Sequence, residues 1–79
     1  MGTSSLKRVL ITGGTGFLGQ KLAMRLRDGF QVSLTGRNHD QNRLASEATG
    51  CRVFPSDVAS LSATRDVFAE TRPDLVIHA

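Results

Sequence analysis

The chain of 79 residues contains no tryptophan, no tyrosine and a single cysteine. One cysteine cannot form an internal disulfide, which excludes a disulfide-stabilised scaffold and favours a reducing, cytoplasmic environment. Cys51 lies between Gly50 and the strand-like Arg52–Phe54, so we expect a structural strand residue rather than a reactive thiol. No apolar run approaches the roughly 18 residues of a membrane span, and we expect no membrane partner.

The charge balance is modestly basic, with 10 Lys and Arg against 7 Asp and Glu. Such an excess raises the question of a nucleic-acid partner. The basic residues are dispersed rather than gathered in a stripe, and neither Trp nor Tyr is present to stack on bases. We therefore expect no nucleic acid, and a phosphate-bearing cofactor accounts for the positive excess equally well.

Length and composition indicate one small globular unit. A chain of this size buries only about 60 to 65% of the surface that its unfolded form exposes, so we expect marginal stability. An apolar content of 39% and a charged content of 22% are typical of globular chains. Residues 1–6 are expected to be a flexible lead-in and residues 7–79 the folded unit. No His and Cys cluster has metal-ligand spacing, so we expect no metal site.

A glycine-rich stretch, Thr12–Gly19, follows an apolar run and precedes a segment with helical spacing. A helix N-terminus leaves several N–H groups unpaired and carries a partial positive charge, and glycines let an anion approach them. Residues Gly14–Gly19 match G-x-G-x-x-G, and Gly13–Gly19 match G-x-x-G-x-x-G, so Gly16 and Gly19 serve in both registers. The alternative is a glycine-rich surface turn, but the position between a strand and a helix favours a dinucleotide phosphate site.

Apolar periodicity and helix breakers predict alternating strands and helices. Leu18, Leu22 and Leu26 recur at helical spacing and are expected to form the buried face of the first helix. The expected strands are 6–11, 30–35, 51–54 and 74–79, and the expected helices are 17–28, 41–49 and 61–71.

This order predicts a Rossmann-type α/β fold, a parallel sheet ordered 3-2-1-4. The glycine turn then falls at the switch point where open parallel sheets bind ligands. The fourth strand would leave an apolar edge unpaired, so we expect the chain to be truncated after it.

Several single residues are expected to delimit or orient these elements. Gly29 and Gly50 should end the first two helices in the left-handed conformation. Pro55 should halt the third strand because it has no N–H, and Ser60 should cap the third helix. The residues expected to face the core are Leu44, Ala45 and Ala48 in the second helix and Ala63, Val67 and Phe68 in the third.

The sequence resembles the extended short-chain dehydrogenase/reductase family, which contains sugar-nucleotide epimerases, dehydratases and reductases. The resemblance covers nearly all of residues 7–79 and rests on three segments in order, Thr12–Gly19, Asp57-Val58 and Pro73–Ala79. It implies that the full-length protein is an NAD(P)-dependent enzyme and a homodimer. It also implies a sugar or sugar-nucleotide substrate, bound by a C-terminal part that is missing here.

The resemblance also implies cofactor roles for individual residues. Gly13, Gly16 and Gly19 resemble the three motif glycines, and Phe17 and Leu18 resemble the residues whose N–H groups hold the pyrophosphate. The other implied contacts are Thr15 within the motif, Asp57 as acceptor for the adenine amino group, Val58 as the apolar contact beside adenine, and Ala79 as the start of an Ala-rich turn bordering the cofactor.

Two of the polar residues have structural alternatives. Asp57 has the spacing of a residue that caps a turn after Pro55-Ser56. A lone His after an apolar strand, such as His78, is expected to be a packed or hydrogen-bonded residue rather than a catalyst.

The end of the second expected strand departs from the pattern of an NAD enzyme. That pattern places Asp or Glu about 20 residues past the first glycine to hold the ribose 2'-hydroxyl, whereas this chain has Gly36-Arg37-Asn38. Glycine leaves room, and an Arg can grip a 2'-phosphate or lie on adenine. We therefore predict NADP as the cofactor, with Arg37 as main determinant and Asn38 or His39 as helpers. The alternatives are NAD as cofactor and Arg37 as a solvated loop charge.

The resemblance implies hydride transfer assisted by a Tyr-x-x-x-Lys pair. Since the chain has no Tyr, no catalytic residue can be assigned and this stretch alone is not expected to be active. Three classes stay open: the cofactor half of an oxidoreductase, epimerase or dehydratase; a non-catalytic NADP-binding sensor; and a scaffold whose glycine turn binds nothing. The fold alone cannot choose among them.

Overall fold

The computed structural model describes residues 6–57 and 60–79 and shows strands and helices in strict alternation. Residues 1–5 of the expected lead-in and Val58 lie outside the described residues. The four strands are β1 (Arg8–Thr12), β2 (Gln31–Gly36), β3 (Arg52–Pro55) and β4 (Leu75–His78). The three helices are α1 (Phe17–Leu26), α2 (His39–Thr49) and α3 (Leu61–Thr71).

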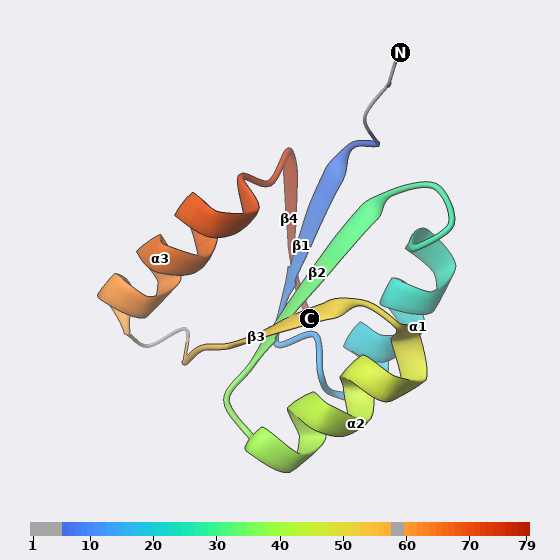
Figure 1. The fold of residues 1–79 in the computed structure, drawn as a ribbon, viewed down its shortest axis with the longest axis horizontal. Coiled ribbons are helices and arrows are strands. Elements are labelled where there is room, and N and C mark those ends of the chain that lie inside the picture. Colours follow the sequence, from blue (N-terminus) through green and yellow to red (C-terminus); the bar gives the residue numbers. More distant parts are fainter. Residues whose placement is uncertain (1–5, 58–59) are drawn as a thin grey trace.

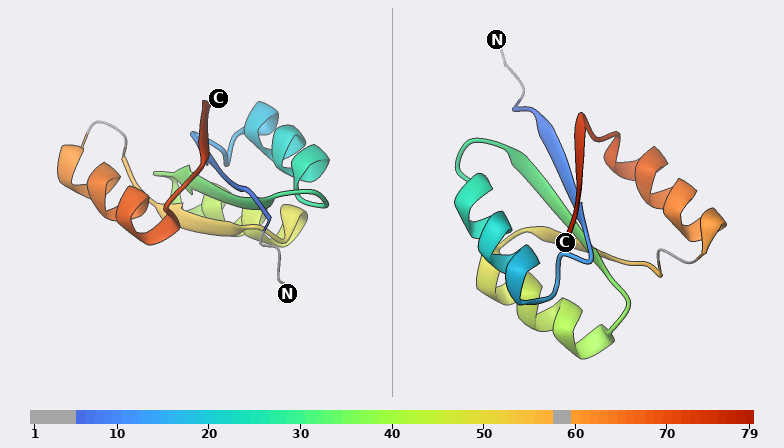
Figure 2. Two further views of the ribbon diagram at one scale, coloured as in Figure 1. Left: turned by 90° about the horizontal axis from the view of Figure 1, so that it is seen from above. Right: turned by 180° about the vertical axis from the view of Figure 1, so that it is seen from behind.

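The strands form one parallel sheet in the order β3-β2-β1-β4, which confirms the predicted topology. α1 and α2 cover one face of the sheet and α3 lies on the other (Figures 1 and 2). Because all strands are parallel, their carboxyl ends gather at one edge, where the loop from β1 to α1 also lies. No helix in the described ranges is long and apolar enough to cross a bilayer.

The core is built around β1, whose apolar run is covered on both faces, as a central parallel strand requires. Val9 and Ile11 belong to the cluster that packs with α1 and α2, while Leu10, also fully buried, lies with Val67 and Phe68 of α3. Successive side chains of a strand point to opposite faces, so one continuous run serves both layers.

The buried face of α1 differs from the predicted one. Leu18 is 60% exposed, and the fully buried positions are Gly19 and Ala23, with Leu22 and Leu26 partly buried. A Cβ on Gly19 would run into the backbone of the preceding loop, so small residues let the first turn of the helix lie directly on that loop. Leu18 is displaced to the outer side as a consequence.

The buried face of α2 also differs. Ala45 is buried as predicted, but Leu44 and Ala48 are exposed, and Asn42 and Thr49 are buried instead. These polar side chains can be buried because each donates a hydrogen bond, Asn42 Nδ2 to a carbonyl of β2 and Thr49 Oγ1 to Ala45 O (2.7 Å). Hydrophobic periodicity could not predict the buried face of α2, because polar residues form part of that face.

In α3 the predicted range and cap are confirmed, but the burial is only partly as predicted. Ser60 Oγ accepts a hydrogen bond from Ala63 N at 3.3 Å. Val67 is buried and Ala63 is half-buried, whereas Phe68 is 38% exposed.

Three predictions about where helices and strands begin or end are wrong, those for Gly29, for Pro55 and for the start of α2. Gly50 is left-handed (φ 71°) as predicted, but Gly29 is not. α1 ends at a right-handed Arg27, and the chain turns because the N–H groups of both Gly29 and Phe30 donate to Leu26 O.

Pro55 does not halt β3 but forms its last residue, opposite Gly36. β3 is an outer strand and Ser56 N donates to Gly36 O, so the missing N–H of Pro55 interrupts no ladder bond. His39 and Asp40 lie before the expected helix 41–49 but form the first turn of α2.

Candidate functional site

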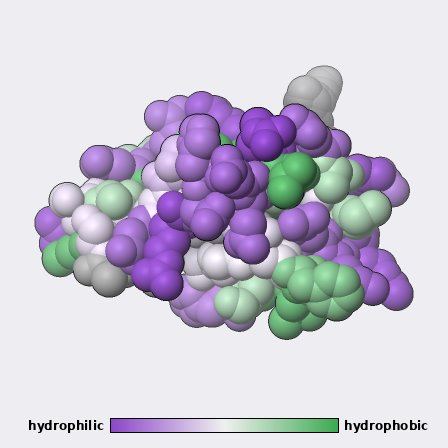
Figure 3. All heavy atoms as spheres, turned by 90° about the horizontal axis from the view of Figure 1, so that it is seen from below, coloured by the Kyte–Doolittle hydropathy of each residue, from purple (hydrophilic) through white to green (hydrophobic). Residues whose placement is uncertain are grey.

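A hollow of about 430 Å³ opens at the edge where the strands end. It brings together four of the predicted cofactor residues, Gly13, Arg37, Asp57 and Ala79, from four separate segments of the chain. Figure 3 views the molecule from the side toward which β1, β2 and β4 run, and hydrophilic residues cover most of that side, with separate hydrophobic areas among them. The full lining is Thr12, Gly13, Thr35, Gly36, Arg37, Ser56, Asp57, His78 and Ala79.

Hydrogen bonds donated by backbone N–H groups hold the glycine-rich loop and the neighbouring strand ends together. Gly14 N donates to Thr35 O (2.8 Å), Gly13 N donates to Thr35 Oγ1 (3.2 Å), and Ala79 N donates to Thr12 O (3.0 Å). Sequence reasoning did not identify Thr35. The available signal was that β1 and β2 both end near a threonine, a small polar side chain that can bond to an adjacent loop.

Each of the three motif glycines has a different structural role. Gly13 has φ +67°, and a Cβ there would lie 3.0 Å from Ala79 O, so only glycine fits the turn. A Cβ on Gly16 would meet only Gly13 O at 3.8 Å, so its outer side is open to an approaching group. Gly19 packs on the backbone of Gly14 and sets the closeness of α1 to the loop.

α1 begins differently from the other two helices. Asn38 Oδ1 accepts from Gln41 N (2.9 Å) at the start of α2, and a serine hydroxyl does the same for α3. The N-cap of α1 is Gly16, which has no side chain to accept such a bond.

The first hydrogen bond of α1 runs from Gln20 N to Gly16 O (3.0 Å). The N–H groups of Phe17, Leu18 and Gly19 therefore lie ahead of the helical ladder, and no side chain in the described part of the chain caps them. This arrangement favours an anion at the start of α1, where the helix dipole adds to the N–H donors.

Two predicted contact residues direct their side chains elsewhere. Thr15 is buried with its Oγ1 against Gly36, and its carbonyl accepts from Gln20 Nε2 (2.9 Å). Asn38 caps α2 through Oδ1 and does not line the hollow. The cap uses Oδ1 of Asn38 and leaves its Nδ2 group for other contacts.

Arg37 projects from the rim of the hollow and is exposed. It follows Gly36, which is buried. The packing inside the protein requires glycine at this position, because a Cβ there would collide with Thr15 Oγ1 and Asn42 Oδ1. The small residue at the end of β2 thus serves the packing of α2 on the glycine loop. In the described ranges Arg37 makes no ion pair with an acid, and its guanidinium is available to a ligand.

The remaining polar residues of the hollow are partly occupied by the protein. Thr12 Oγ1 and His78 Nδ1 lie 2.5 Å apart, and either group can donate according to the tautomer of His78, which is hydrogen-bonded as expected. Asp57 is exposed, and its carbonyl oxygen accepts from Ser60 N (2.8 Å), so the residue begins the turn into α3. The adenine role of Asp57 stays a prediction.

Comparison with known proteins places these features in a family. The family model for the NAD dependent epimerase/dehydratase family matches residues 9–79. The chain is 37% identical to the ketoreductase azaE of Aspergillus niger over 95% of its length, and 35% identical to the UDP-glucose 4-epimerase of Neisseria meningitidis serogroup B over 92%. It spans about a quarter of the length of these curated relatives, 25% and 24% respectively.

Solved structures show the same arrangement. The UDP-glucose 4-epimerase of Thermus thermophilus, solved in complex with NAD, superposes with a TM-score of 0.78 at 30% identity. That match covers 90% of this chain and 23% of that one. BdcA, solved in complex with NADPH, superposes with a TM-score of 0.80 at 27% identity, covering 94% of this chain and 32% of that one. The relatives thus include proteins solved with either nicotinamide dinucleotide.

Proposed function

Because the chain belongs to the NAD-dependent epimerase/dehydratase family, we propose that residues 7–79 are the N-terminal part of the NADP(H)-binding half of an extended short-chain dehydrogenase/reductase. The complete protein is then an oxidoreductase, epimerase or dehydratase that acts on a sugar or sugar nucleotide and forms a homodimer. The observation that carries the proposal is the start of α1, whose first N–H groups have no side-chain cap while the other two helices are capped.

The residues present fit a dinucleotide. Its pyrophosphate would accept hydrogen bonds from the N–H groups of Phe17 and Leu18, over the open side of Gly16. The turn at Gly13 leaves no room for a side chain beside Ala79, so backbone would border the ligand there. The bound nicotinamide would supply hydride transfer.

The adenosine end would occupy the hollow at the strand ends. Asp57 would accept from the adenine amino group, with Val58 beside the ring. Arg37 would meet the ribose 2'-phosphate, because it lies at the end of β2, where an NAD enzyme carries a carboxylate. A planar guanidinium can donate two parallel hydrogen bonds to a phosphate, which a hydroxyl cannot match.

Binding measurements on the full natural protein test the cofactor preference. The dissociation constants for NADP and NAD are compared in the parent, in Arg37→Ala, and in Arg43→Ala as the matched control, since Arg43 lies on α2 and pairs with Glu47 at 3.6 Å. We expect Arg37→Ala to weaken NADP by about 1.5 to 3 kcal/mol and NAD far less. Equal affinity of the parent protein for the two cofactors would refute the preference.

A second candidate is a non-catalytic NADP-binding sensor of the same fold. The two candidates share the cofactor site and differ in turnover. Oxidation of NADPH by the full natural protein in the presence of carbonyl sugars supports the enzyme, and tight NADPH binding without turnover supports the sensor.

A further inference from the structure

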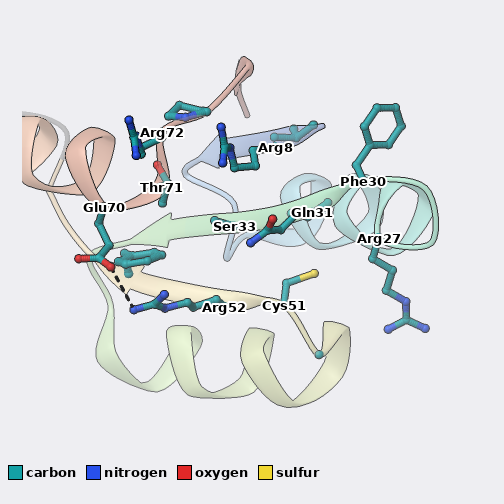
Figure 4. Close-up of a pocket in the computed structure, with 15 residues that line it drawn as sticks. Arg8, Arg27, Phe30, Gln31, Ser33, Cys51, Arg52, Glu70, Thr71 and Arg72 are labelled. Atoms are coloured by element: carbon teal, nitrogen blue, oxygen red, sulfur yellow. Dashed lines mark ion pairs between the residues drawn. The ribbon is translucent and has the colours of Figure 1, made fainter. Parts of the chain in front are cut away.

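A second concave region lies at the opposite edge of the sheet, where the strands begin. It has a volume of about 380 Å³. Figure 4 shows Arg8 and Arg72 along one side and Arg52 along the other, with Ser33 between them. We call the space among these three arginines the arginine groove. It shares no lining residue with the hollow that holds Arg37.

The charges of the groove are incompletely balanced. Among the described residues that line it, Glu70 is the only acid, and it stands 3.8 Å from Arg52. Arg8 Nε lies 4.0 Å from Asp74. Both separations exceed hydrogen-bonding distance, so the guanidinium donors still lack close acceptors. Such exposed pairs contribute little to stability and can give way to a ligand.

One side of the groove is held in place by an aromatic ring. The guanidinium carbon of Arg52 lies 4.5 Å from the ring centroid of Phe54. Stacking of this kind orients the planar guanidinium without consuming its in-plane N–H donors. A fourth arginine, Arg27, takes no part, because it donates to Thr49 O (2.6 Å) and its head points away from the other three in Figure 4.

Arg72 occupies a position that suits glycine. It ends α3 with φ +47°, and it is the one non-glycine residue with positive φ in the described part of the chain. The left-handed conformation costs a residue with a Cβ about 1 kcal/mol or more, and helix ends of this type usually carry Gly or Asn. An unfavourable backbone conformation at the edge of a concave, basic region indicates that the Arg72 side chain has a function there.

We propose that the arginine groove is a second anion site that binds the phosphate group of a small phosphorylated metabolite. Guanidinium forks match the oxygens of a phosphate, Ser33 adds a hydroxyl donor, and the volume suits a small molecule. The dinucleotide does not account for these charges, because its site lies at the other edge of the sheet.

Calorimetric titration of the full natural protein with inorganic phosphate and, separately, with glycerol 3-phosphate tests the site. Saturating NADP is present so that the other phosphate site is filled. Saturable binding of either ligand supports the proposal. Tighter binding of glycerol 3-phosphate than of inorganic phosphate would mean that the groove also contacts the ester group. Absence of saturable binding by both overturns it.

Four variants separate a specific site from general charge effects. Arg72→Gly should weaken binding at least about tenfold while the melting temperature stays or rises, because glycine suits the left-handed position. Arg52→Met should weaken it similarly and keep the contact with Phe54. Glu70→Gln should tighten binding, because it removes the carboxylate beside Arg52.

The matched control is Arg65→Ala, since Arg65 is exposed on α3 and does not line the groove. Arg65→Ala should leave the dissociation constant unchanged. A loss of affinity in Arg65→Ala equal to that in Arg72→Gly would show non-specific attraction of anions and overturn the proposal. The outcome is independent of the proposed NADP preference, which is read from Arg37 variants alone.

Discussion

Asn42 Nδ2 donates a buried hydrogen bond to Gly36 O at 2.7 Å, which ties α2 to the last residue of β2. Gly36 immediately precedes Arg37, so this bond sets the point from which the proposed specificity residue projects. Asn42 Oδ1 has no hydrogen-bond partner in the described structure and lies where a Cβ of Gly36 would be. The amide therefore fills the space of a missing side chain as well as bonding to the backbone.

Replacing Asn42 with Leu should uncouple α2 from the end of β2. Gly36 O keeps its bond from Ser56 N (3.0 Å), so the free energy of unfolding should fall by only about 1 kcal/mol. The preference for NADP over NAD should also fall, because Arg37 loses its support. Denaturant unfolding and the two dissociation constants measure these effects. A variant with the stability and the cofactor ratio of the parent would show that the bond positions nothing.

Glycine substitutions distinguish close packing from backbone conformation. Gly19→Ala should destabilise by about 1 to 3 kcal/mol, because the added methyl meets the backbone of Gly14. Gly50→Ala should cost about 1 kcal/mol through its positive φ alone, since open space surrounds it. Gly29→Ala, with open space and no positive φ, is the control and should be neutral or slightly stabilising. Equal losses in all three would contradict this assignment.

Asn38 is proposed both to cap α2 and to help bind the cofactor, and two substitutions separate these roles. Asn38→Ala removes the acceptor for Gln41 N and should cost about 1 kcal/mol. Asn38→Asp keeps the cap and removes the Nδ2 donor, so stability should hold while NADP binding weakens. Undiminished NADP affinity in Asn38→Asp would assign the residue to capping alone.

The fold followed from the sequence because each strand-to-helix step carries a local signal. The apolar run at β1, the glycines after it and the Ser60 cap each specify one element without help from the rest of the chain. The glycine-rich loop was identified for the same reason, since its spacing is contained in eight consecutive residues.

The predictions were wrong at positions where tertiary contacts determine whether a residue is buried or which group it bonds to. Leu18 carries the right spacing for the core, but Gly19 lets the helix approach so closely that Leu18 faces outward. Asn42 and Thr49 are polar by type and buried by hydrogen bonding, which no hydrophobic pattern reveals. Thr35 was missed because its role depends on the adjacent loop, 22 positions earlier in the chain.

Asp74 should make stability depend on acid pH. The hydrogen bond from Arg8 N (2.8 Å) is the main cause that lowers the pKa of Asp74 below its ordinary value of 3.8. Desolvation opposes this shift and is the next largest effect, and the charges of Arg8 and Lys7 lower the pKa further. A pKa that is lowered in the folded state contributes stability above pH 3.8, and this contribution is lost as the pH falls through the folded value.

The variant Asp74→Asn should therefore be less stable than the parent at neutral pH, and the difference should shrink as the pH falls below 3.8. Thermal unfolding across an acid pH series measures the difference. A gap between the two proteins that stays constant over the whole series would mean that the carboxylate charge contributes nothing.

The central claim is that the uncapped N–H groups at the start of α1 hold the diphosphate of a nicotinamide dinucleotide. Amide NMR signals of the full natural protein, followed through a titration with NADP, test it most directly. The signals of Gly16, Phe17, Leu18 and Gly19 should shift the most and saturate together with those of Arg37. Saturating NADP that leaves the four α1 signals unmoved, while shifts appear elsewhere or not at all, would contradict it.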